Sequence, residues 1–179
     1  ATTPFVKLLD FLQGKWLGHP LHPAIVHVPI GLWTVAAAAD LAVWGGLWPE
    51  TLPHLAFYAV GLGVAAALLA IPTGAADWAA IKPEKPAWRL TLYHLVLNLT
   101  ATVLWTVNFG LRLGTEPAGA VVHGWIVATS LAGAALVWVG GYLGSLLVFD
   151  HGIGVARQSK KKWREIAARG GARLPEEKS

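Results

Sequence analysis

Seven histidines supply most of the side chains in this chain that bind metals or exchange protons near neutral pH. Cysteine and methionine are absent, so thiolate and thioether ligands are excluded. His27 and His94 lie inside apolar segments, where ionisable side chains are uncommon and mark candidate functional sites. Neutral imidazoles from two helices can bind a haem iron from its two faces. We therefore expect His27 and His94 to be the axial ligands of a b-type haem.

Two further residues are expected to lie beside this histidine pair, and two other histidines suggest a second haem site. Gly31 lies four residues after His27 on the same helical face, where it would admit a porphyrin edge. Asn98, one turn after His94, is expected to orient an imidazole or bond the ligand, or else to join helices through its amide. His54 and His123 form a candidate second haem pair on the other side of the membrane, which would give a transmembrane electron path.

A bare metal ion or a proton-transfer site is the alternative use of the same residues. Imidazole and carboxylate ligands suit Zn²⁺ or Fe²⁺, and His22, Asp77 and His151 are the further candidates for such a site. Groups that titrate near neutrality also suit proton movement or a quinone headgroup. In the simplest interpretation, His22 and His151 only anchor helix ends at the lipid headgroups and no cofactor is bound.

The elements that position these residues are membrane-spanning helices. The chain is 55% hydrophobic and only 13% charged, whereas charged residues make up about a quarter of a soluble domain. Apolar segments long enough to cross a bilayer occur at 24–48, 54–76, 88–111 and 120–149. These predict an all-α, integral membrane, antiparallel four-helix bundle over 19–155, after an interfacial helical segment at 1–18 and before a basic tail at 156–179. Gly140-x-x-x-Gly144 is expected to let helices pack closely.

The basic residues predict the orientation of the bundle. Of 14 Lys and Arg, two lie in the N-terminal segment, three in the 77–89 link and eight after Phe149, whereas Arg112 alone is assigned to the opposite links. The positive-inside rule then places both termini in the cytoplasm. This orientation gathers five candidates at one end of the bundle, namely His22, His27, Asp77, His94 and His151. The basic tail fits attraction to lipid headgroups, so nucleic-acid binding is not expected.

Several of these residues carry a resemblance to a known family. The pieces are His22-Pro23 with Pro29-Ile30-Gly31, Asp77-Trp78, His94 with Leu97-Asn98, Gly141-Tyr142-Leu143-Gly144, and His151-Gly152-Ile153-Gly154-Val155. Over about 19–155 the chain resembles a bacterial membrane family of four predicted spans, catalogued as domain of unknown function 2231. The resemblance favours His22, His94 and His151 as the family's polar positions. The family usually has Gly-Glu at Ser145-Leu146 and a basic residue at Asp150, so no role for that carboxylate carries over.

Some members of that family are joined to Rieske-type iron–sulfur modules, which implies redox partners. We therefore predict a b-type cytochrome-like redox subunit of the bacterial inner membrane, with a quinone or a Rieske-type protein as its partner. The competing hypothesis is a non-enzymatic accessory or scaffold subunit of a larger complex, and the third is a metal-binding membrane protein. No hydrolytic or phosphate-binding motif occurs in the sequence, so a stand-alone enzyme is not expected.

Overall fold

The part of the chain that the structure describes is mainly helical. The structure is a computed structural model that describes residues 4–115, 121–154 and 160–171, and no strand occurs among them. Its elements are α1 (Pro4–Leu12), the 3-10 turn η1 (Lys15–Leu17), α2 (Leu21–Ile25), α3 (His27–Trp44), α4 (Leu52–Ala79), α5 (Pro86–Leu113), α6 (Gly124–Phe149) and α7 (Lys160–Arg169). The predicted all-α fold is confirmed.

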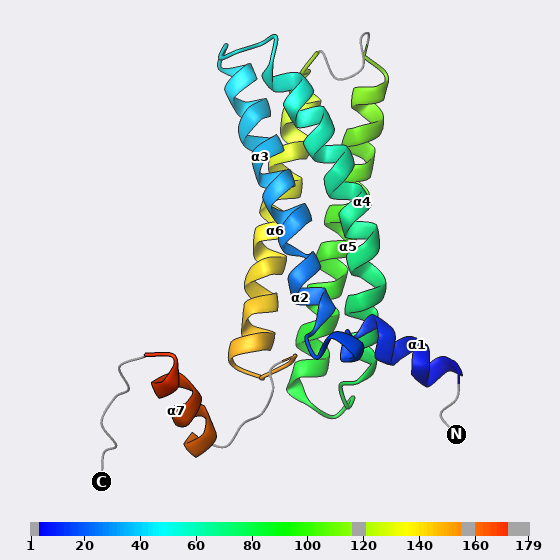
Figure 1. The fold of residues 1–179 in the computed structure, drawn as a ribbon. Helices are drawn as coiled ribbons and strands as arrows, with labels where there is room; N and C mark the ends of the chain where they lie inside the picture. Colours follow the sequence, from blue (N-terminus) through cyan, green and yellow to red (C-terminus); the bar gives the residue numbers. More distant parts are fainter. Residues whose placement is uncertain (1–3, 116–120, 155–159, 172–179) are drawn as a thin grey trace.

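Four segments in the described residues are long and apolar enough to cross a bilayer when α2 and α3 are taken together. They are Leu21–Trp44, Leu52–Ala79, Pro86–Leu113 and Gly124–Phe149. The segments run alternately up and down as a bundle (Figure 1), which agrees with the predicted membrane fold. Their ends differ by a few residues from those expected, and the predicted start of the fourth span at 120 lies outside the described residues.

Prolines explain two helix starts and one interruption. Pro53 and Pro86 lie in the first turns of α4 and α5, where a missing backbone N–H leaves no helical hydrogen bond unmade. Pro29 lies in the first turn of α3, so the Ile25 carbonyl lacks its usual helical donor and the span is interrupted at Val26. His22 consequently lies on the short helix α2, at the end of the first span.

The helices pack in a ring, with α3 against α4, α4 against α5, α5 against α6, and α6 against α3. The closest packing joins α3 to α4 and α5 to α6, so the bundle is built from two helix pairs. α3 and α5 lie diagonally across it. Large apolar side chains remain exposed on the outer faces, among them Leu62, Leu69, Val103 and Trp138, as expected of a surface that faces lipid.

Two tryptophans fill the middle of this bundle. Trp33 of α3 and Trp105 of α5 stack with ring centroids 5.5 Å apart and planes 8° from parallel. Each indole packs against a glycine, because a Cβ at Gly133 would lie 2.6 Å from Trp105 Nε1 and a Cβ at Gly63 would collide with Trp33. Small residues in α4 and α6 therefore make room for the large rings of α3 and α5.

A buried ion pair crosses the bundle near the opposite end from α2. Asp40 of α3 and Arg112 of α5 are both fully buried and form a salt bridge. Arg112 is therefore inside a helix, and its assignment to an outer link was wrong, because Asp40 compensates its charge within the bundle. The links at 45–51 and 114–123 thus contain no Lys or Arg. This increases the charge asymmetry behind the predicted orientation.

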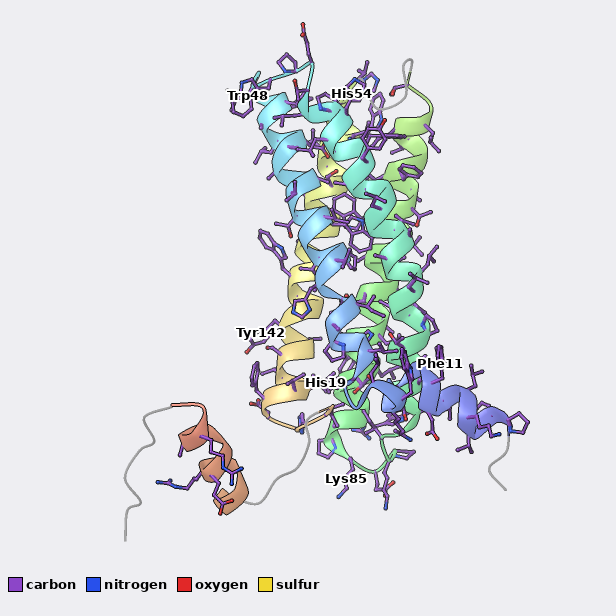
Figure 2. All side chains as sticks on the ribbon, viewed as in Figure 1. Phe11, His19, Trp48, His54, Lys85 and Tyr142 are labelled. Atoms are coloured by element: carbon purple, nitrogen blue, oxygen red, sulfur yellow. The ribbon has the colours of Figure 1, made fainter. Side chains whose placement is uncertain are left out.

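The N-terminal segment is helical, as expected. Gln13, which directly follows α1, donates a hydrogen bond of 2.8 Å from Nε2 to the Ala76 carbonyl near the end of α4. Several apolar side chains of α1 are exposed, including Phe5, Leu8 and Phe11. Figure 2 labels Phe11 on this helix. This pattern is typical of a helix in the membrane interface, which stays a prediction. Within the predicted tail at 156–179, the structure adds the helix α7.

Candidate functional site

The chain brings two histidines together inside the bundle. His22 lies in the first turn of α2 and His94 lies about two turns into α5, on diagonally opposed spans. Their ring centroids are 6.2 Å apart, and the ring planes are 84° from parallel. Both side chains are partly buried. The partner of His94 is therefore His22 rather than His27.

Backbone carbonyls hold both imidazoles in the same way. His22 Nδ1 lies 3.0 Å from the Ala70 carbonyl oxygen and His94 Nδ1 lies 2.8 Å from the Gly140 carbonyl oxygen. A carbonyl only accepts hydrogen bonds, so Nδ1 carries the proton in both rings. In the described residues, no hydrogen bond reaches either Nε2 atom. Both Nε2 lone pairs are therefore available to an external ligand.

Further polar groups orient the two rings. Thr73 Oγ1 lies 3.2 Å from His22 Nδ1 and donates its own proton to the Ala70 carbonyl at 2.7 Å. Asn98 Nδ2 donates to the His94 carbonyl at 2.7 Å, whereas its 3.4 Å approach to His94 Nδ1 joins two donors and adds no bond. The carbonyl contacts are thus the ones that set the tautomers.

Glycines on α4 and α6 provide the space for these side chains. A Cβ at Gly74 would lie 2.7 Å from His22 Cε1, and a Cβ at Gly144 would lie 3.0 Å from His94 Cε1. A Cβ at Gly140 would lie 2.6 Å from Asn98 Nδ2. The Gly140-x-x-x-Gly144 motif therefore does more than bring helices close, because both of its glycines accommodate polar side chains of α5.

The histidine pair lines a cavity of about 440 Å³ between the helices. Most of the wall is apolar, including Ile30, Leu95 and Val148, and its polar members besides the pair include Asp77 and Asn98. Ligand-binding pockets commonly enclose about 300–1,000 Å³ behind mainly apolar walls with a few placed polar groups. Size and lining thus both fit a bound organic molecule.

The remaining predicted residues divide between this cavity and the surface. His27 lines the cavity edge, but its side chain is exposed, and no ring contact or hydrogen bond joins it to His94 in the described part of the chain. Gly31 is exposed with nothing within 4 Å of a Cβ, and it does not line the cavity. A porphyrin edge beside Gly31, as expected from the sequence, would therefore lie outside the cavity, because that face of α3 points outward.

The second predicted pair lies at the other end of the bundle. His54 and His123 are both exposed, and His123 stacks on Trp125 with centroids 4.4 Å apart. Figure 2 labels His54 and His19 at opposite ends. His151 is half-buried but does not line the cavity. Among the described residues, no group of three or more His, Cys, Asp or Glu side chains is arranged to hold a metal ion.

A repeat in the chain explains why the site has two similar halves, and sequence reasoning missed it. His22 and Trp33 are followed 72 residues later by His94 and Trp105, and Leu32-Trp33-Thr34-Val35 recurs unchanged as Leu104-Trp105-Thr106-Val107. The small residues that face them recur at a spacing of 70: Gly63 with Gly133, Ala70 with Gly140, and Gly74 with Gly144. These paired spacings were the signal that would have joined His22 to His94.

Comparison with known proteins places the chain in a family. The family described as "Predicted membrane protein (DUF2231)" matches residues 18–157. The chain belongs to this family. No curated protein and no solved structure matches it. The matched region contains His22 and His94, the glycines that face them (Gly74 and Gly144), and all four spans. The candidate site therefore lies within the part that defines the family.

Proposed function

We propose that this membrane protein binds one b-type haem between His22 and His94 and carries electrons one at a time. The observation behind the proposal is the pair of neighbouring imidazoles whose Nδ1 atoms are bonded to backbone carbonyls and whose Nε2 atoms have no partner among the described residues. Metal-bound histidines generally have this arrangement, in which the second ring nitrogen donates to a carbonyl or carboxylate. His22 replaces His27 as the proposed partner of His94.

The ring separation supports coordination of one metal ion from two sides. Two imidazoles on opposite sides of an ion, each bound at about 2 Å, have ring centroids about 6 Å apart. The observed separation is 6.2 Å. This agreement favours His22 and His94 as the two residues that would hold the cofactor.

The number of protein ligands favours haem over a bare ion. Structural and catalytic zinc sites use at least three protein ligands, and no such group occurs among the described residues. Haem supplies four ring nitrogens to its iron, so two histidines complete the coordination. The mainly apolar cavity of about 440 Å³ that both histidines line suits a porphyrin. When bound, haem iron accepts and releases one electron between its ferric and ferrous states.

The expected redox partners stay those predicted from the sequence, a quinone or a Rieske-type protein. The proposed role of the chain's own residues is to hold the cofactor. The Ala70 and Gly140 carbonyls keep both Nε2 atoms deprotonated, and the mainly apolar walls of α4, α5 and α6 limit access of water. These residues would hold a haem in place and suit it to electron transfer.

The test is an absorption spectrum of protein purified from haem-supplied cells, before and after dithionite. We expect a bis-histidine b-type spectrum whose haem content is lost in both His22→Ala and His94→Ala. His27→Ala and His19→Ala are the matched controls and should keep it, because both side chains are exposed. A colourless but folded wild-type protein would contradict the proposal and support a scaffold. Loss of haem in His27→Ala, with retention in His22→Ala, would instead identify His27 as the partner of His94, as the sequence predicted.

A further inference from the structure

The repeat extends beyond the candidate site to the far end of the bundle. Asp40 and Arg112 are also separated by 72 residues, so they occupy equivalent positions in the two halves. Three equivalent pairs are therefore in direct contact: His22 with His94, Trp33 with Trp105, and Asp40 with Arg112. Equivalent residues contact one another only near a two-fold axis. The axis consequently runs along the bundle and relates α2–α4 to α5–α6.

We propose that the membrane domain consists of two copies of one helix-pair unit, and that the buried Asp40–Arg112 pair makes each unit associate with the other kind rather than with its own. The first unit is Leu21–Ala79 and the second is Pro86–Phe149. Parallel repeats related by an axis along the membrane normal are known in membrane transporters. Here the charge buried at the contact between the repeats would determine which unit each repeat associates with.

Of the three pairs in contact on the axis, the charged pair is the one that can make this selection. A complex of two first units would still bring histidine to histidine and tryptophan to tryptophan on the axis. It would also bring Asp40 against a second Asp40, and two second units would bring Arg112 against a second Arg112. Burying two like charges without compensation is strongly unfavourable. Because this repeated position is Asp in one unit and Arg in the other, a first unit can associate with a second unit. Association of two first units or of two second units is excluded.

The surroundings of the pair leave little to neutralise a second like charge. Asp40 Oδ2 accepts bonds from Arg112 and, at 2.6 Å, from Ser130 Oγ. Arg112 Nε donates to Asn108 Oδ1 at 2.9 Å. Asp40 Oδ1 and Arg112 Nη1 are buried with no hydrogen-bond partner in the described residues. Each charge thus depends mainly on the other unit for compensation.

The polar residues that bond to Asp40 and Arg112 both belong to the second unit. Asn108 and Ser130 lie in the second unit, and their equivalents in the first unit are the fully buried Ala36 and Val60. An exchange of all six side chains across the axis would therefore recreate the same polar set at the positions related by the two-fold axis. This exchange provides a test that depends on the equivalence of the two units, which an ordinary salt bridge does not require.

The experiment compares full-length variants by circular dichroism, size-exclusion chromatography and thermal unfolding in detergent. Asp40→Arg and Arg112→Asp each place like charges at the axis and should give little folded monomer. The double exchange Asp40→Arg with Arg112→Asp should recover much of the folded fraction. Adding Ala36→Asn, Val60→Ser, Asn108→Ala and Ser130→Val should bring the thermal midpoint closer to wild type.

Two results would overturn the proposal. One is that the single variants fold as well as the wild type, which would show that like charges are tolerated on the axis. The other is that both exchanged variants fold as poorly as the single variants, which would show that the two positions are not interchangeable. All readouts concern folding and assembly, so the result does not depend on whether a cofactor is bound.

Discussion

The two ends of the bundle bury polar side chains in different ways. At one end, His22 and His94 each have one nitrogen bonded to the backbone and one without a protein partner, beside a cavity. At the other end, Asp40 and Arg112 bond mainly to each other, and neither lines that cavity. Both ends contain intramembrane ionisable groups. A free lone pair next to open space, rather than burial, distinguishes the candidate binding site from the structural cluster.

The largest expected effect tests the structural end. Arg112→Leu leaves the Asp40 carboxylate buried without its main partner, so we expect a loss of about 3–5 kcal/mol in the free energy of unfolding. Denaturant unfolding in micelles, followed by circular dichroism, measures this loss. Haem content per folded molecule should not change, because Arg112 does not line the cavity.

The double variant Asp40→Leu with Arg112→Leu is the control for that loss. Replacing both members of a buried ion pair with apolar side chains is often neutral or stabilising by about 1–4 kcal/mol. We therefore expect stability near that of the wild type. If the single variant also lost its haem while remaining folded, the proposed separation between the two ends would be wrong.

Sequence reasoning recovered the fold because each span carries its own evidence. Length, apolarity and flanking prolines mark a membrane helix without reference to the other helices. Predicting the site also required knowing which segments contact one another. His27 and His22 lie on the same span, and the choice between them depends on how α2 turns at Val26 and on the space that Gly74 leaves for the His22 ring. Such contacts between distant segments do not follow from one helix considered alone.

The repeat shows which part of that missing information was in the sequence. The spacing from His22 to Trp33 recurs from His94 to Trp105, and equivalent residues of a duplicated unit are natural neighbours across an axis. That comparison pairs His94 with His22 and Arg112 with Asp40. It does not predict which carbonyls bond to the rings, because every residue has a backbone carbonyl and the residue type does not indicate which one accepts a hydrogen bond.

A smaller effect is expected from the glycines that support the rings. Gly74→Ala would place a methyl group 2.7 Å from His22 Cε1 and displace the ring, and Gly144→Ala would crowd His94 at 3.0 Å. Displacing a metal ligand or its support typically lowers affinity about 10–100-fold. Haem titration of the apoprotein should show the larger loss for Gly74→Ala, since its contact is closer.

Gly110→Ala is the matched control for these two variants. Gly110 also lies within a spanning helix, and a Cβ there meets nothing within 4 Å. We expect its haem affinity and stability to match those of the wild type. Equal losses in all three variants would attribute the effect to the helices in general and would contradict a specific role for the glycines that face the histidines.

The smallest expected effect separates the two halves of the site. Thr73 Oγ1 adds a second contact to His22 Nδ1, whereas its equivalent in the other unit, Leu143, has no hydroxyl to offer His94. Thr73→Val should therefore make the His22 half resemble the His94 half. One hydrogen bond contributes about 0.5–1.5 kcal/mol, so haem affinity should fall by about tenfold or less. Titration measures the change. Complete loss of haem would show that the hydroxyl, rather than the Ala70 carbonyl, holds the ring in its binding tautomer.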